Sequence, residues 1–169
     1  VGPGMAATET HIIEEETFAS GCAVAEVEVD SETGKVTILN YVMAQDSGRI
    51  LDRQIAEGQL YGGIAHGIGN TLFEWMRYDD DAQPVTATSA EYLLVTAPEM
   101  PRADLILHET PTTRNPLGVK GIGECGLMPA TSAIVSAIED ALSPFDAHLT
   151  RVPLTPPDIL AAIAAGSGD

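Results

Sequence analysis

The fold is decided by residues 51–76, LDRQIAEGQLYGGIAHGIGNTLFEWM. Four apolar side chains recur there at intervals of four residues: Leu60, Ile64, Ile68 and Leu72. This spacing is typical of an amphipathic helix, because positions four apart lie on the same helical face. The stretch therefore predicts a long helix that begins near Asp52, and its apolar side must pack on another element.

Five glycines interrupt the same stretch: Gly58, Gly62, Gly63, Gly67 and Gly69. Each interior glycine costs about 1 kcal/mol relative to alanine, so such a helix needs a compensating close contact. Polar side chains also lie along it at helical spacing, namely Gln59, His66 and Asn70. Two interpretations are open. Either the polar side chains face water while the glycines pack tightly on a sheet, or the glycine side faces a bulky ligand that hydrogen-bonds to Gln59.

Upstream of this helix, residues 23–46 predict a β-hairpin. Apolar and polar residues alternate along AVAEVEVD (23–30), and apolar residues continue through KVTILNYVMAQD (35–46). The SETG sequence at 31–34 between them is a turn signal. One face of the hairpin must be covered, and the helix in residues 51–76 is the expected cover.

Downstream, the loop GVKGIGECG (118–126) places four glycines around one carboxylate, Glu124. Because glycine lacks a Cβ, the backbone of this loop can approach a neighbouring group closely. MPATSAIVSAIEDAL (128–142) follows with helical periodicity and a proline near its start. Glu124 is therefore expected just before a helix N-terminus, where free N–H groups favour anionic ligands. The alternative is an ordinary loop-to-helix turn with a solvent-exposed glutamate.

The remaining segments complete an α+β fold with a mixed sheet. Three further elements are expected: a strand in ADLILHET (103–110), a further strand in LTRVPL (149–154) and a short helix in TPPDILAAIAAG (155–166). Residues 1–20 are typical of an extended arm and residues 164–169 of a tail. No repeat or linker divides the sequence, so we expect residues 1–169 to form a single domain.

Composition argues against several classes of function. The 169 residues carry 25 acidic and 8 basic side chains, for a formal net charge of -17, so nucleic acid and anionic membranes are poor partners. No apolar run reaches membrane-spanning length and no signal peptide is recognisable, so a cytoplasmic protein is expected. Two cysteines and four scattered histidines favour neither a disulfide framework nor a zinc site. A stand-alone nucleotide-binding domain is disfavoured because the glycine motifs lack the required strand-to-helix context.

The order of these motifs resembles the C-terminal part of the molybdenum-binding subunit of the xanthine oxidase family. The residues within these motifs are most similar to those of the large subunits of aerobic carbon monoxide dehydrogenases and bacterial aldehyde oxidoreductases. The resemblance covers residues 20–160 and is carried by EVEVDSETGKVTI (26–38), QIAEGQLYGGIAHGIGNTLFE (54–74), NPLGVKGIGECG (115–126) and PATSAIVSAIEDAL (129–142). It implies a fold of the molybdopterin-binding domain type.

Site residues follow from this resemblance one by one. Glu124 matches the glutamate of the family's GxGE motif, which implies a general base beside the molybdenum. Gln59 matches the glutamine of the GQ motif, which implies a contact with the pterin. Further residues expected near the cofactor are Lys120, Gly121, Gly123 and Cys125. Of these, Lys120 is the expected support for Glu124.

The resemblance also implies the activity. It points to a component of a molybdenum hydroxylase that oxidises an aldehyde or hydroxylates an N-heterocycle with water-derived oxygen. The expected cofactor is molybdopterin with molybdenum, in its cytosine dinucleotide form, and partner subunits are expected to carry a 2Fe–2S cluster and FAD.

Two departures from the family pattern qualify this expectation. Family subunits are far longer and hold the other half of the cofactor cradle upstream, so this chain is expected to act with the remaining part of the molybdenum subunit. It is then a split-gene product or a piece of a larger subunit. The segment GLMPAT (126–131) departs from the carbon monoxide dehydrogenase pattern, so carbon monoxide is not predicted as substrate. The alternative function is that of a non-catalytic acidic assembly subunit, in which the loop and helix only form an interface.

Overall fold

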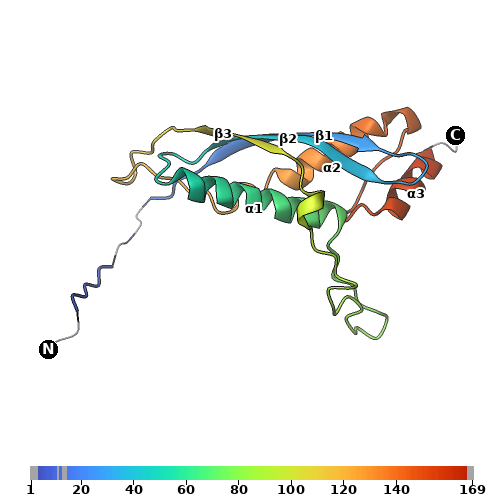
Figure 1. Cartoon of the computed structure of the whole chain (residues 1–169), viewed down its shortest axis with the longest axis horizontal. Helices are drawn as coiled ribbons and strands as arrows, with labels where there is room; N and C mark the ends of the chain where they lie inside the picture. Colours follow the sequence, from blue (N-terminus) through green and yellow to red (C-terminus); the bar gives the residue numbers. More distant parts are fainter. Residues whose placement is uncertain (1–3, 11, 13–14, 167–169) are drawn as a thin grey trace.

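A computed structural model of the chain describes residues 4–10, 12 and 15–166. Its centre is a three-stranded mixed sheet with the strand order β1-β2-β3 (Figure 1). The elements, in chain order, are β1 (Ser20–Val29), β2 (Val36–Asp46), α1 (Arg53–Leu72), the 3-10 turn η1 (Ala97–Glu99), β3 (Ala103–His108), α2 (Ala130–Ala141), the 3-10 turn η2 (Ser143–Phe145) and α3 (Pro156–Gly166). The expected α+β architecture with a mixed sheet is confirmed.

The predicted hairpin is formed by β1 and β2, which pair antiparallel. Its turn is held by the Asp30 carboxylate, which accepts hydrogen bonds from the amides of Glu32 at 2.8 Å and Thr33 at 3.2 Å. Gly34 closes the turn at φ +74°, where a Cβ would lie 2.2 Å from the Pro156 carbonyl oxygen. Glycine is therefore required both by the left-handed backbone and by the approach of α3.

A β-bulge in the hairpin explains why its sequence does not alternate strictly. Glu26 pairs with Asn40, but the next residue, Val27, pairs with Ile38. One additional residue in β2 is thereby left without a partner, which shifts the side-chain alternation by one position. As a result, Ile38 and Tyr41 both turn toward the helices although they are three residues apart.

Helix α1 follows the prediction at its start and ends earlier than expected. Asp52 is the N-cap, and its carboxylate accepts the Ile55 amide at 3.0 Å. The helix ends at Leu72 because Phe73 leaves the helical conformation and packs against the core. Residues 73–76 therefore lie outside the helix, in contrast to the expectation that the whole stretch is helical.

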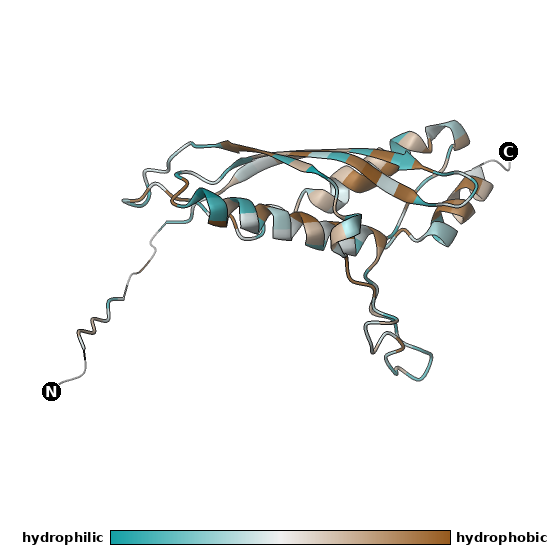
Figure 2. Ribbon diagram, viewed as in Figure 1, coloured by the Kyte–Doolittle hydropathy of each residue, from teal (hydrophilic) through white to brown (hydrophobic). Residues whose placement is uncertain are grey.

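The core lies between one face of the sheet and the two helices α1 and α2. Most of its fully buried side chains come from β2, α1 and α2, with Ile159 added from α3, and the largest are Tyr41, Met43, Leu60, Ile64, Ile68, Ile134, Ile138, Leu142 and Ile159. Figure 2 shows hydrophobic residues on the strands and on the helices beneath them. Burial of each large apolar side chain contributes about 1.5–3 kcal/mol. Helix α1 shares this core with β2 as expected, but the closest cover of the hairpin is α2, which packs on β1.

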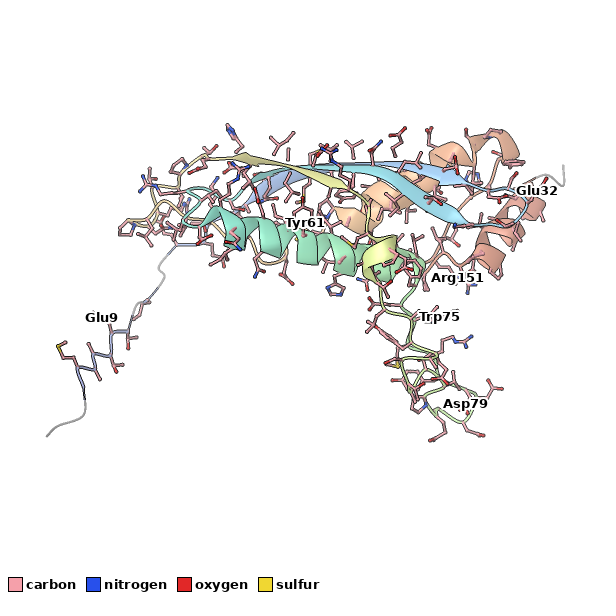
Figure 3. All side chains as sticks on the ribbon, in the orientation of Figure 1. Glu9, Glu32, Tyr61, Trp75, Asp79 and Arg151 are labelled. Atoms are coloured by element: carbon pink, nitrogen blue, oxygen red, sulfur yellow. The ribbon has the colours of Figure 1, made fainter. Side chains whose placement is uncertain are left out.

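Strand β3 joins the sheet parallel to β2, after the chain has crossed through α1. Leu105 and Leu107 are half-buried and Ile106 is exposed, in the alternation that the sequence predicts. The Tyr61 hydroxyl on α1 donates to the Ala103 carbonyl at 2.8 Å, which ties the helix to the start of β3 (Figure 3).

The expected strand at residues 149–154 is not formed, which corrects the sequence prediction. Pro153 has no N–H to give to a strand ladder. The segment is instead held from both sides: the Leu154 amide donates to the Thr71 carbonyl at 2.7 Å, and Arg151 bonds Asp158 at 2.6 Å. The Arg151 guanidinium also stacks 5.6 Å from the centre of the Trp75 ring (Figure 3).

Two segments extend away from this body. Residues 73–96 project beside the end of α1, and residues 4–10 of the N-terminal arm lead away from the sheet (Figure 1).

Candidate functional site

The exposed side of α1 and the glycine loop at 118–126 meet at a cavity of about 330 Å³. Its lining includes Gln59, Gly62, His66, Gly123 and Glu124. The structure thus brings together Gln59 and Glu124, which are 65 positions apart in the sequence. His66 joins them from a position two helical turns after Gln59, whereas Asn70 does not line this cavity.

Close glycine contacts hold the loop against α1. A Cβ on Gly63 would lie 2.7 Å from the Gly126 Cα, and a Cβ on Gly126 would lie 2.4 Å from the Leu60 carbonyl oxygen. At Gly67 a Cβ would meet the Ala130 Cβ at 2.3 Å. These glycines allow the loop and the start of α2 to pack directly on the α1 backbone.

Other glycines of the two motifs border open space. A Cβ added at Gly58, Gly62 or Gly121 would meet no atom within 4 Å, and one at Gly123 would approach only the Gln59 Oε1 at 3.9 Å. The glycines therefore divide between packing and an open wall. The packing is on the loop and α2 rather than on the sheet, and the ligand-facing interpretation stays a prediction.

Glu124 lies on a series of turns before α2. Its carbonyl accepts the amides of Leu127 at 3.1 Å and Met128 at 3.2 Å. Helix α2 begins at Ala130 with Pro129 as N-cap, two residues later than the sequence predicts. The Glu124 carboxylate is exposed and forms no hydrogen bond or ion pair with the residues that the structure describes.

The first half of the loop is fastened to the end of β2. The Lys120 ammonium binds the Asp46 carboxylate at 3.1 Å, and both side chains are largely buried, with exposed fractions of 14% and 16%. The Lys120 amide donates to the Ser47 carbonyl at 2.9 Å. The Lys120 ammonium is occupied by Asp46 and forms no ion pair with Glu124, so the expected support of Glu124 by Lys120 stays a prediction. Sequence reasoning missed Asp46, since nothing in the sequence distinguishes it from other acidic residues.

The environment of Asp46 favours its charged form. Burial would raise its pKa, but four donors lower it: the amides of Gly48 and Thr110, the Lys120 ammonium and the Thr110 side chain. Together they hold the pKa of Asp46 well below its ordinary value.

Cys125 directs its thiol toward the protein. The Sγ lies 3.5 Å from the Gly121 carbonyl oxygen. Burial raises the pKa of this thiol, while hydrogen bonds with Ser47 and Gln45 lower it. Both partners are buried, with 2% exposure each.

The cavity wall of the described residues offers hydrogen-bonding groups and bare backbone. Among the described residues, no three His, Cys, Asp or Glu side chains gather in a metal-binding group. The cavity wall instead offers an amide at Gln59, a carboxylate at Glu124 and glycine backbone without side chains. These groups suit a flat heterocycle with hydrogen-bonding edges, so the wall fits a pterin that carries a metal.

In the part of the chain that the structure describes, no helix is long and apolar enough to cross a membrane.

Comparison with known proteins gives a concordant result. A family model described as the molybdopterin cofactor-binding domain matches residues 3–101. The 6-hydroxypseudooxynicotine dehydrogenase complex subunit gamma of Paenarthrobacter nicotinovorans is 35% identical over 93% of this chain and 20% of its own length. The nicotine 6-hydroxylase large subunit of the same organism is 36% identical over 95% of this chain and 20% of its own length.

A solved structure is also similar. Quinoline 2-oxidoreductase from Pseudomonas putida 86 superposes with a TM-score of 0.80 at 38% identity, over 82% of this chain and 18% of that one. Fold and comparisons together define the class: a molybdopterin-binding domain. The chain belongs to the molybdopterin cofactor-binding domain family, and its relatives are molybdenum-dependent oxidoreductases of the xanthine oxidase family, as its motifs predict. It spans about a fifth of the length of the curated relatives that it matches.

Proposed function

We propose that this chain supplies the catalytic base, Glu124, and one wall of the molybdopterin pocket of a molybdenum hydroxylase. The observation that carries the proposal is the shared cavity. Glu124 and Gln59 line the same space, and the glycine wall beside them leaves room for a bulky ligand. The bound cofactor would supply the redox chemistry that converts water-derived oxygen into a new C–O bond on the substrate.

Each predicted site residue has a distinct task in the proposal, whether it lines the cavity or lies beside it in the loop. The Gln59 side-chain amide hydrogen-bonds the pterin edge, and Gly121 and Gly123 allow the backbone to approach the cofactor. Glu124 accepts a proton on its carboxylate, and its position in a cavity suits a general base that must reach the reacting atoms. Lys120 and Cys125 are assigned to the same loop, where they hold the backbone.

An N-heteroaromatic compound is the substrate class that the comparisons favour over an aldehyde. Two similar proteins are named for such compounds, the nicotine 6-hydroxylase and the quinoline 2-oxidoreductase. Carbon at the position next to a ring nitrogen is electron-poor, which suits attack by an oxygen nucleophile.

Partner chains complete the enzyme in this proposal. The cavity is bounded on one side by α1 and the loop, and the chain covers only a fifth of its relatives. The remaining part of the molybdenum subunit would form the opposite wall. A 2Fe–2S subunit and an FAD subunit would carry electrons away, and the pterin would have the cytosine dinucleotide form.

The test is a Glu124→Gln variant of the assembled enzyme, compared with Glu28→Gln on the exposed side of β1. We expect Glu124→Gln to lower kcat by about 10²–10⁴-fold, the usual contribution of a general base. Molybdenum content should stay unchanged, and Glu28→Gln should behave as the wild type. Full turnover of Glu124→Gln with molybdenum bound would exclude Glu124 as the base.

Metal analysis separates this proposal from an assembly subunit. If the chain only forms an interface, variants of the cavity wall such as Gln59→Ala will leave the molybdenum content of the complex unchanged. The proposal requires that content to fall. A complex with its neighbouring chains that never contains molybdenum would exclude the enzymatic role altogether.

A further inference from the structure

We propose that the C-terminal end of β2 positions Glu124, with Asp46 and Ser47 as positioning residues. The inference rests on the proposed role of Glu124 and concerns how that carboxylate is held. Asp46 and Ser47 touch neither the cavity nor Glu124 itself. They act through the loop on either side of it.

The loop needs an external support because it has few side chains of its own to pack. Gly121 and Gly123 border open space, and a chain with several glycines has many accessible backbone conformations. Glu124 also makes no side-chain contact that would fix it among the described residues. Its position must therefore be set by the residues before and after it.

The first anchor lies four residues before Glu124. The Lys120 ammonium bonds Asp46, and the Lys120 amide bonds the Ser47 carbonyl, so side chain and backbone are fixed to the same strand end. The Asp46 carboxylate is itself rigid, because it also accepts the amides of Gly48 at 2.9 Å and Thr110 at 3.0 Å. A buried ion pair with these additional hydrogen bonds is geometrically specific.

Backbone pairing continues this anchor toward the start of the loop. Gly48 and Val119 form an antiparallel bridge, and the Arg49 amide donates to the Gly118 carbonyl at 2.9 Å. The Asn115 side chain bonds both backbone groups of Val119, at 2.9 and 3.1 Å. The segment that leads to Glu124 is thus held by a single β-bridge to the residues that directly follow β2.

The second anchor is the residue after Glu124. The Cys125 thiol is partly buried and lies 3.5 Å from the Gly121 carbonyl oxygen, and Ser47 and Gln45, which are buried at the end of β2, lower its pKa. The Gln45 amide in turn donates to the Ser47 hydroxyl at 3.1 Å. The hydrogen bonds of Lys120 thus end on residues 46 and 47, and Glu124 lies between Lys120 and Cys125 as part of the cavity lining.

The test uses the assembled holoenzyme with Asp46→Asn, Lys120→Met and Lys120→Arg. The matched control is Asp104→Asn, an exposed carboxylate on β3 whose side chain is 64% exposed. Turnover is measured per bound molybdenum, and amide hydrogen exchange is measured across residues 118–126. We expect Asp46→Asn and Lys120→Met to lower kcat by about 10- to 100-fold at nearly constant KM, because small misplacements of a catalytic group cost that much.

Exchange of the loop amides should be faster in these two variants, and Lys120→Arg should restore both kcat and protection. Asp104→Asn should match the wild type. Wild-type kcat in Asp46→Asn and Lys120→Met would overturn the inference, as would a loss of kcat with unchanged exchange in the loop. If Glu124→Gln keeps full turnover while Asp46→Asn still accelerates loop exchange, the proposed base is wrong although the anchor exists.

Discussion

Helix α1 carries glycines on two sides, and they have different surroundings on each. On one side, Gly63 and Gly67 lie where any Cβ would collide with the loop or with α2. On the other side, Gly58 and Gly62 face open space beside Gln59, and Gly63, which also lines that cavity, lies at the border of the two sides. One helix thus joins a close-packed interior to a bare wall.

This difference shows why the helix tolerates so many glycines. The packed glycines are compensated in the folded chain, because they permit backbone contact with neighbouring elements. The open glycines have no such compensation in this chain, although each costs about 1 kcal/mol in helix propensity. A cost without a structural return is the expected sign of a functional constraint, and in the proposed function this constraint is the space for a cofactor.

The packed side should show the largest response to substitution. Ile64 is completely buried, whereas Ile55 on the same helix is 65% exposed. Ile64→Ala should lower the free energy of unfolding by about 3 kcal/mol, since it removes buried methylene groups and leaves a cavity. Ile55→Ala is the matched control and should change it by less than about 0.5 kcal/mol. Urea unfolding followed by the fluorescence of Trp75 measures both, and equal effects would mean that α1 has no packed side.

The contact between α1 and the loop gives the next largest effect. A Cβ on Gly63 would lie 2.7 Å from the Gly126 backbone, which cannot move without displacing the loop. Gly63→Ala should therefore destabilise the chain by about 2 kcal/mol despite the better helix propensity of alanine. Hydrogen exchange should report faster opening of residues 118–126. An increase in stability would show that the loop does not rest on α1.

The open side should respond with the opposite sign. Gly62→Ala, one residue away, adds a methyl group where no atom lies within 4 Å. The chain should gain about 1 kcal/mol of stability from helix propensity. The assembled enzyme should nevertheless contain less molybdenum, because the methyl group occupies the cofactor wall. A stabilised variant with full molybdenum content would remove this wall from the proposed pocket.

The sequence predicted those parts of the molecule that local patterns determine. Periodicity located α1, the hairpin and β3. The GQ and GxGE motifs, which occur together in this sequence as they do in the family, identified the class. The glycines of α1 were recognised as requiring a reason, but their division into packed and open sides depends on which elements surround the helix. The spacing of the glycines along the sequence does not show which of them a neighbouring element will cover.

Tertiary contacts account for what the sequence did not predict. Asp46 ends a strand 74 residues before Lys120, and only the fold brings them together. The strand expected at residues 149–154 does not form. A short apolar pattern does not show whether the folded sheet has a free edge strand with which the segment could pair. The bulge in β2 likewise follows from the need to turn both Ile38 and Tyr41 toward the helices.

The smallest expected effect concerns a buried hydroxyl group without a hydrogen-bond partner in the described part of the core, that of Tyr41. Tyr41 is 1% exposed, and its hydroxyl is the buried side-chain group that lacks a hydrogen-bond partner among the described residues. A buried unsatisfied hydroxyl costs free energy, so Tyr41→Phe should stabilise the chain by up to about 1 kcal/mol at neutral pH. A loss of stability would instead indicate that the hydroxyl finds a partner in solution.

Alkaline pH should amplify this small difference. Burial raises the pKa of Tyr41 to about 12, whereas the unfolded chain ionises this tyrosine near its ordinary value of about 10. The stabilising preference for the neutral form is therefore complete below about pH 10 and is lost as the pH rises toward 12. Tyr41→Phe removes this titration, so its advantage over the wild type should widen between these pH values. Urea unfolding at pH 7, 10 and 11 measures the difference, and a constant gap would place the Tyr41 hydroxyl in contact with water rather than in the core.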